Sequence, residues 1–289
     1  MRPRRPEFCG VIHPQDSVCR QRIGFALAGR GHVRFRAMKT PSRFPLWLIL
    51  LTGALPALAQ SSFLPLTDAR GLTLHQVVAR SVEFKGGAAL QLTAPPAAAR
   101  PSEPASAVTK KAGKTKAGAG AGEAGRLDHL AVVDGVVFAN GTIELELAGE
   151  PAAGAAGGAR GFVGVAFRVQ PDRRTYDCIY LRPTNGRADD QERRNHTVQY
   201  ISHPEHTWFS LREKFPSRYE SYVDIVPAEW IHVRIEVDGG KARLFVNRQP
   251  QPTLIVNDLK SGDIARGAVA LWFEGSTLSH FRNLRITPR

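Results

Sequence analysis

Hydrophobic and polar residues alternate along much of the chain with the two-residue period of a β-strand. In Thr142–Ala148 and again in Trp230–Val237, the odd positions are apolar and most even positions are polar. Successive side chains of a strand point to opposite faces, so each segment predicts a strand with one buried face. Similar runs predict strands at Leu72–Val78, Val82–Lys85, Ala88–Thr93, Leu130–Val133, Val136–Phe138, Phe162–Val169, Tyr176–Arg182, His196–Ser202, Ala242–Val246, Thr253–Val256, Ala268–Phe273 and His280–Ile286.

No segment keeps a helical period for ten residues or more, and only Thr207–Lys214 has the pattern of a short helical turn. Gly86-Gly87 separates two of the predicted strands as a hairpin turn would. Many short strands joined by Gly-rich turns predict an all-β fold, either an antiparallel β-sandwich or a jelly roll.

The segment Met38–Ala59 has the three parts of a secretory signal peptide. A short basic stretch is followed by the apolar run Phe44–Leu51 and then by Ala57-Leu58-Ala59, which predicts cleavage before Gln60. The run is too short to span a bilayer, so we expect a periplasmic or extracellular protein with no membrane span after cleavage. Because a signal peptide begins where translation begins, we interpret the Arg-rich residues 1–37 as a mis-annotated leader.

One segment of the remaining chain has a composition unlike that of a folded domain. From Pro95 to Gly125 the residues are almost only Ala, Pro, Gly, Lys and Ser, which cannot bury enough apolar area to offset the entropy of ordering. The segment before this stretch is too short to hold a core of its own. We therefore predict one jelly-roll domain over residues 60–289, interrupted by a disordered insertion at 95–125.

The formal net charge of +13 would favour nucleic acid or an anionic membrane surface if it lay on the fold. Residues 1–37, however, have eight Arg against two acids, and residues 38–59 add two cations. Residues 94–128 carry six basic and three acidic side chains, which leaves +2 for the rest. We therefore exclude nucleic acid as a partner.

Four segments of the second half resemble strands of the concanavalin A-like (laminin-G-like) jelly rolls. Glu229–Val237 has their W-x-x-φ-x-φ-x-φ pattern, in which φ is apolar, and Lys241–Asn247 is similar to the strand that follows. Gly267–Trp272 and His280–Ile286 resemble the closing pair, and the last run is also typical of the 3-keto-disaccharide hydrolase branch. The resemblance implies the fold and leaves the function open, because one sandwich hosts many activities.

The same resemblance draws attention to acidic residues on one strand. Laminarinase-type glycosidases of this fold carry E-x-D-x-x-E, whereas this chain has Glu144 and Glu146 followed by Ala148-Gly149. Residues two apart on a strand lie about 6.5–7 Å apart, which suits the two carboxyl groups of a glycosidase. Glu144, Glu146 and His196 are therefore the catalytic candidates. In the alternative interpretation, the two glutamates simply face solvent.

The segment Tyr176–Tyr222 concentrates arginines and aromatic rings. Its members are Arg182, Arg187, Arg193, Arg194, Arg212 and Arg218 among Tyr176, Tyr180, Tyr200, Trp208, Tyr219 and Tyr222. Planar rings beside the fork-shaped donors of Arg suit the faces and hydroxyl groups of sugars.

If His196–Ser202 is a strand, His196 and Tyr200 share one face, and with Tyr180 and Arg182 they would line a groove on a concave side. The ligand-binding candidates are Tyr180, Arg182, Asn185, Arg194, His196, Gln199 and Tyr200. In the alternative, the rings cap the core and the arginines pair with Asp189, Asp190 and Glu192 on the surface.

Related sandwiches often hold Ca²⁺ in loops rich in Asp, Asn and carbonyl oxygens. Asp189-Asp190 with Asn185 form one candidate set of ligands, and Asn257-Asp258 with Asp263 form another, although neither has a fixed metal-binding spacing. Ca²⁺ is the one cofactor for which the sequence offers ligands.

Three functions follow from these observations. The first is carbohydrate binding on the concave face by an exported monomer. The second is hydrolysis of glycosides or 3-keto-disaccharides, and the third is a protein-interaction module without catalysis. The sequence does not decide between binding and hydrolysis, and it does not identify the saccharide.

Overall fold

The computed structural model describes residues 61–96, 129–263 and 265–289. All of these residues fall within the unit Pro56–Arg289. The expected leader at 1–37, the signal peptide at 38–59 and residues 97–125 of the expected insertion lie outside the described residues. Among the helices that the structure describes, none is long and apolar enough to cross a membrane.

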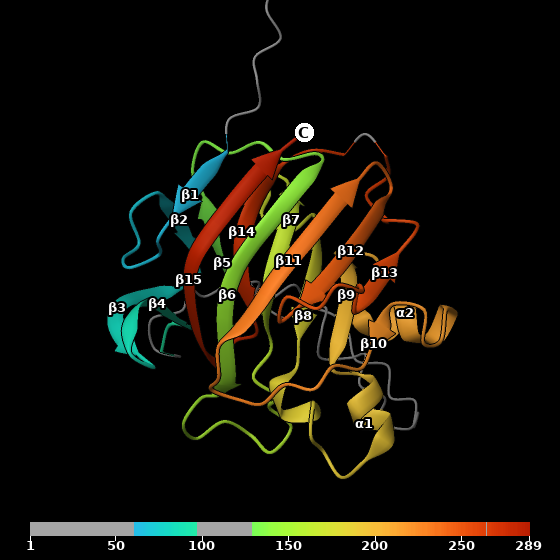
Figure 1. Cartoon of the computed structure of the whole chain (residues 1–289), viewed down its shortest axis with the longest axis horizontal. Helices are drawn as coiled ribbons and strands as arrows, with labels where there is room; N and C mark the ends of the chain where they lie inside the picture. Colours follow the sequence, from blue (N-terminus) through green and yellow to red (C-terminus); the bar gives the residue numbers. More distant parts are fainter. Residues whose placement is uncertain (1–60, 97–128, 264) are drawn as a thin grey trace, which may run out of the picture. The chain divides into compact units, whose positions relative to one another are not determined.

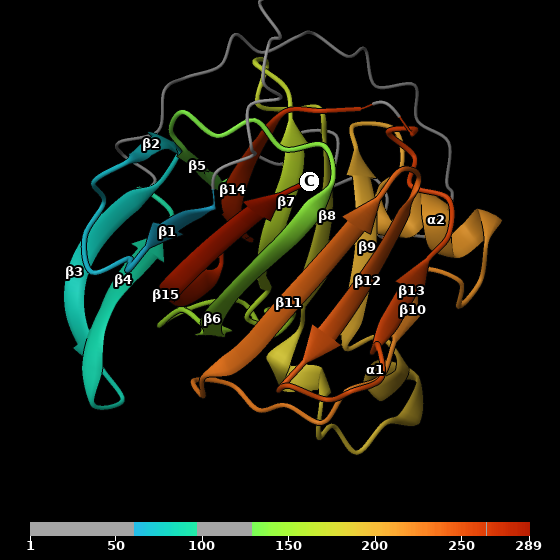
Figure 2. The ribbon, with the colours of Figure 1, turned by 45° about the horizontal axis from the view of Figure 1, so that its top comes forward.

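The strands form two antiparallel sheets that lie one over the other (Figures 1 and 2). The first sheet has the order β13 (Leu254–Val256), β12 (Lys241–Val246), β11 (Ile231–Asp238), β6 (Gly141–Pro151), β15 (Thr277–Pro288), β4 (Gly87–Thr93) and β3 (Val78–Phe84), and β1 (Ser62–Leu64) also pairs with β15. The second sheet has the order β10 (Glu220–Ser221), β9 (Val198–His203), β8 (Tyr176–Leu181), β7 (Val163–Val169), β14 (Ala268–Phe273), β5 (His129–Val133) and β2 (Leu72–His75). This arrangement is an antiparallel jelly-roll β-sandwich, so the predicted all-β sandwich fold is confirmed.

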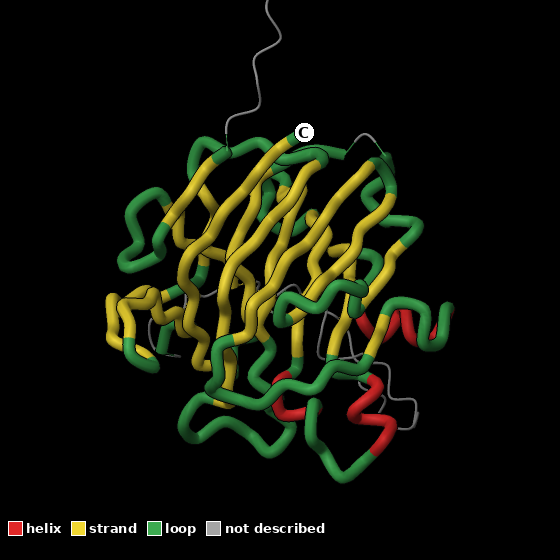
Figure 3. Tube along the Cα trace, viewed as in Figure 1, coloured by secondary structure: helices red, strands yellow, loops and turns green. Residues whose placement is uncertain are grey.

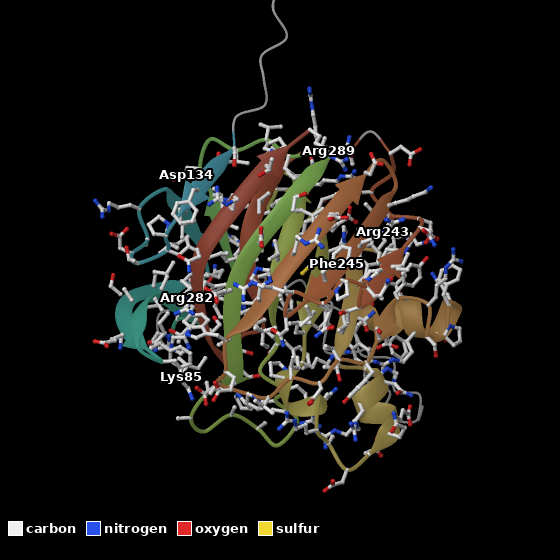
Figure 4. The ribbon with its side chains drawn as sticks, viewed as in Figure 1. Lys85, Asp134, Arg243, Phe245, Arg282 and Arg289 are labelled. Carbon is white, nitrogen blue, oxygen red and sulfur yellow. The ribbon has the colours of Figure 1, made fainter. Side chains whose placement is uncertain are left out.

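The alternation in β6 and β11 explains how the first sheet is built. Ile143 and Leu145 are at most 1% exposed and face the core, while Glu144 and Glu146 lie on the other face. On that outer face, the carboxylate of Glu146 accepts hydrogen bonds from Arg282 of β15 at 2.8 and 3.2 Å. Figure 4 shows Arg282 among the side chains of this sheet.

The hairpin β3–β4 forms one edge of the first sheet (Figure 2). Its turn is Lys85-Gly86, whose φ angles of 49° and 79° are those of a tight hairpin turn, one residue earlier than expected. Phe84 ends β3 and stacks on His280 of β15 with ring centroids 3.8 Å apart. This contact buries His280, which is 3% exposed, and lowers its pKa to about 4 by desolvation.

The two faces of the second sheet are set by the pairing of its strands. Ile179 of β8 lies opposite Tyr200 of β9, and Tyr180 lies opposite Gln199. Tyr180 and Tyr200 therefore point to opposite faces. Gly164 of β7 lies beside Tyr180, and a Cβ at this glycine would come within 2.6 Å of Tyr180, so that only glycine fits there.

Short helices gather between β8 and β10 (red in Figure 3). They are the 3-10 turn Pro183–Asn185, α1 (Gln191–Asn195) and α2 (Trp208–Lys214). The helix α1 is a correction, because only Thr207–Lys214 was expected to form a helical turn. Asp190 caps α1 by accepting a hydrogen bond from the Arg193 amide at 2.7 Å, and Thr207 caps α2 in the same way at 3.2 Å.

Candidate functional site

A pocket of about 370 Å³ lies where these short helices meet the second sheet. It is lined by Gly158, Arg160, Phe162, Arg182, Asn185, Arg193, His196, Trp208 and Arg212, and we call it the arginine pocket. Three of the predicted ligand-binding residues, Arg182, Asn185 and His196, are thus brought together.

A buried carboxylate holds the pocket together. The Glu220 side chain is 3% exposed and accepts hydrogen bonds from Nε of Arg212, at 3.1 Å, and from its Nη2. Nη1 of Arg182 lies 3.6 Å from the same carboxylate. Nδ1 of His196 lies 3.0 Å from it, although not in hydrogen-bond geometry. Glu220 therefore balances part of the positive charge of the pocket.

Arg182 is fixed from several sides. It is 4% exposed, and its guanidinium donates to the carbonyl oxygen of His196 at 2.7 Å and to Oη of Tyr180 at 2.9 Å. It also donates to Oε1 of Gln199 at 3.3 Å. Tyr180 and Gln199, which are 2% and 0% exposed, support Arg182 from behind the pocket. Four hydrogen-bonded or ionic partners leave Arg182 one orientation.

Two aromatic rings form the apolar part of the pocket. The guanidinium of Arg182 lies 5.2 Å from the ring centre of Phe162, and that of Arg212 lies 4.8 Å from the ring of Trp208. Both distances suit cation–π contacts. Phe162 and Trp208 are both half-buried.

The polar groups of the pocket include atoms without partners. Asn185 is 4% exposed, and its Oδ1 accepts no hydrogen bond among the described residues. Burial, reinforced by the neighbouring Arg212 and Arg182, lowers the pKa of His196 below its ordinary value, although Glu220 opposes this shift. At neutral pH the His196 imidazole is therefore neutral and can accept a proton or a hydrogen bond.

The structure corrects the expected groove at Tyr200. This side chain is fully buried on the face opposite to Tyr180, where its Oη donates to Asp177 at 2.7 Å and accepts from the Lys260 amide at 2.7 Å. His196 does not share a strand with Tyr200, because it ends α1 and β9 begins at Val198. Tyr200 therefore cannot stack on a ligand in the pocket.

Arg194 also points away from the pocket. Its Nη2 donates to Oη of Tyr222 at 2.8 Å, and its guanidinium lies 5.0 Å from the centre of that ring. The adjacent Arg193 lines the pocket in its place. The short helix α1 decides which of the two arginines faces inward.

The catalytic candidates Glu144 and Glu146 lie on the outer face of the first sheet. Oε1 of Glu144 lies 2.8 Å from Nε2 of His232. Hydrogen bonds from Arg282 and Asn283 lower the pKa of Glu146, against the opposing effect of burial. A glycosidase acid needs a raised pKa to keep its proton. Glu146 has the opposite shift.

Two of the candidate calcium ligands already accept hydrogen bonds from other groups of the protein. Asp190 caps α1, and Asp189 beside it is exposed. Asp258 accepts hydrogen bonds from Tyr219 and Lys260 at 2.7 and 2.8 Å, so its carboxylate already has cationic and hydroxyl partners. Within the described ranges, no group of three or more His, Cys, Asp or Glu side chains could hold a metal ion.

Several pocket residues were not among the sequence candidates. Arg193, Trp208 and Arg212 belong to the aromatic and Arg-rich segment, so their composition was the signal that could have found them. Arg160 stands alone in a run of Ala and Gly, which gives no such signal. Its carbonyl oxygen accepts from the Thr184 hydroxyl at 3.3 Å, a contact that ties this run to the pocket.

No protein-family model matches the chain, and no curated protein matches it. The likeness to the 3-keto-disaccharide hydrolase branch therefore remains a prediction. Among solved structures, carbohydrate-binding module CBM66 from Bacillus subtilis is similar over 75% of this chain and 95% of its own, with 11% identity and a TM-score of 0.45.

Two further structures are similar over 79% of this chain. A protein of unknown function with a galectin-like fold from Bacillus subtilis is matched over 96% of its length, with 10% identity and a TM-score of 0.46. The β-glucanase of Bacillus licheniformis is matched over 98%, with 12% identity and a TM-score of 0.41. Because each TM-score lies below 0.5, we draw no functional conclusion from these likenesses.

Proposed function

We propose that the protein binds carbohydrate in the arginine pocket. The observation that carries this proposal is the pairing of two half-buried rings, Phe162 and Trp208, with fixed planar donors in one hollow. A sugar presents C–H groups on its faces, which pack on aromatic rings, and hydroxyl groups at its rim, which need directed hydrogen bonds. The pocket volume falls within the range of about 300–1,000 Å³ found for small-molecule sites.

Orientation of the ligand would come from groups that are already positioned. Oδ1 of Asn185 is a buried acceptor without a partner in the described part of the chain, and a sugar hydroxyl could donate to it. Arg182 is held by Tyr180, Gln199 and the His196 carbonyl, so little side-chain entropy is lost when it meets a ligand.

The test is binding by a Trp208→Ala variant. We expect its affinity for the saccharide found with a glycan array to fall about tenfold, equivalent to ~1.4 kcal/mol, because one stacking ring is lost. Phe63→Ala is the matched control, since Phe63 is an exposed ring of β1 on the other sheet. Calorimetry measures both. The proposal fails if no saccharide binds, or if both variants bind as the parent does.

Hydrolysis in the same pocket is the second candidate, favoured by the neutral His196 beside the buried Glu220. A carboxylate 3.0 Å from an imidazole stabilises the imidazolium that forms when the imidazole takes up a proton as a general base. If the protein is a hydrolase, His196→Gln should abolish turnover of glycosides or 3-keto-glycosides, while Glu144→Gln and Glu146→Gln should retain it. Turnover that survives in His196→Gln removes this role.

A further inference from the structure

The cationic side chains of the arginine pocket outnumber its acidic ones. Arg160, Arg182, Arg193 and Arg212 line it, and Glu220 is a buried carboxylate beside it. Of these four arginines, Arg182 and Arg212 contact Glu220.

The other two arginines lack a carboxylate partner within the described residues. The Arg160 guanidinium donates to the carbonyl oxygens of Gly157 and Ala159, each at 3.0 Å. At Arg193, the backbone amide bonds to Asp190, while the side chain contributes to the pocket lining. Glu192, the nearest acid on α1, is 85% exposed and lies 3.8 Å from Nε2 of His196.

This imbalance has an electrostatic consequence. Burial, together with repulsion from Arg193 and Arg182, lowers the pKa of Arg160. Positive charge that is concentrated in a hollow attracts anions more strongly than the same charge spread over a convex surface. Planar guanidinium groups also match the oxygens of carboxylate and sulfate groups, to which they donate two hydrogen bonds.

We propose that the arginine pocket selects acidic saccharides, and that a carboxylate or sulfate group of the sugar contacts Arg160 and Arg193. This inference rests on the proposed carbohydrate binding and adds the class of ligand. The sugar ring packs on Phe162 or Trp208, while the acidic substituent occupies the part of the pocket where positive charge is not balanced. A neutral sugar would leave these two guanidinium groups without an anionic partner.

The experiment compares an oligogalacturonate with its methyl ester, which has the same backbone without the charge. We expect calorimetry to show at least tenfold tighter binding of the acid, the order expected for one charge-assisted hydrogen bond. The difference should shrink from about 0.01 to about 1 M NaCl, where the Debye length falls from ~30 to ~3 Å. A sulfated oligosaccharide and its desulfated form provide a second matched pair.

Variants identify the residues responsible. Arg160→Gln and Arg193→Gln should each weaken binding of the acid about tenfold and leave binding of the ester unchanged. Arg243 is an exposed residue of β12 in the first sheet (Figure 4) and is not part of the pocket lining. Arg243→Gln therefore removes the same charge outside the pocket and should change neither affinity.

The outcomes separate the two proposals. Equal affinity for acid and ester overturns the acidic preference and leaves carbohydrate binding intact. Binding of neither matched pair, when the glycan array also finds no ligand, overturns both. Inorganic sulfate or phosphate that binds as tightly as the acidic saccharides would overturn the inference in favour of a free-anion site.

Discussion

Replacing Glu220 by Gln tests how the arginine pocket is held together. The Glu220 carboxylate contacts Arg212 and lies 3.6 Å from Arg182 and 3.0 Å from His196. Gln has the same shape, but it lacks the charge and would direct N–H donors toward guanidinium groups that are donors themselves. The change therefore removes the one buried carboxylate that contacts these arginines in the described part of the chain, without opening a cavity.

The expected loss of unfolding free energy follows from how exposed Arg182 and Arg212 are. Removing one member of a buried ion pair costs about 3–5 kcal/mol, because the other charge stays buried without compensation. Arg182, at 5% side-chain exposure, cannot reach water, whereas Arg212, at 31%, can turn toward it. We therefore expect the lower end, about 3 kcal/mol of unfolding free energy. For a domain of this size, that corresponds to a Tm lower by roughly 6–12 °C.

Thermal unfolding followed by circular dichroism measures this change. Glu213→Gln is the control, because Glu213 lies in α2 beside Arg212 and is exposed, and its Tm should change by about 1 °C or less. A shift in Glu220→Gln no larger than that of the control would refute the reasoning. In the folded variant, affinity for an acidic saccharide should be unchanged or higher, since a repelling charge has gone; a loss would contradict the charge argument.

Two further predictions concern stability. The pKa of His280 is lowered to about 4, so the unfolded chain binds more protons between pH 4 and 6.5, and the free energy of unfolding should rise with pH across this window by up to about 3 kcal/mol. Urea titrations at pH 4.5 and 7 measure how much the free energy of unfolding changes with pH. This change should be smaller in His280→Gln, although His196 and His206, whose pKa values are also lowered, keep part of it. If the change is as large in the variant as in the parent, His280 is not its source. Tyr200→Phe removes a hydrogen bond to the buried Asp177 and should cost about 2 kcal/mol by urea unfolding. The saccharide affinity of this variant should equal that of the parent, and a tenfold loss would show that Tyr200 belongs to the binding site.

The strands of the sheets could be predicted from the sequence because the alternation of apolar and polar residues is a local signal. The odd positions of β6 and β11 bury Ile143 and Ile235, as the apolar pattern predicts. Turn chemistry located the β3–β4 hairpin to within one residue, because Lys85 and Gly86 both take positive φ. Neither inference needed information about distant parts of the chain.

The site could be predicted from the sequence only in part, because its composition depends on where strand β9 begins. A strand from His196 would have placed this residue on the face of Tyr200, whereas the five-residue helix α1 moves the start of β9 to Val198. A helix this short is below the length at which a 3.6-residue period can be recognised. The inward position of Arg160 depends on a long-range contact with Thr184, which no local pattern encodes.

The first four strands are divided between the two sheets, and this division bears on what happens when the backbone is cut after them. Within residues 61–96, the strands β1, β3 and β4 belong to the first sheet and β2 belongs to the second. In the first sheet, β1 and β4 pair with β15, and in the second, β2 pairs with β5. Both β15 and β5 lie after residue 128 in the chain. A backbone cut between residues 97 and 128 would leave two fragments that share both sheets. Because strands of both fragments pair within each sheet, we expect the shorter fragment, added as a separate peptide, to restore the sandwich of the longer one.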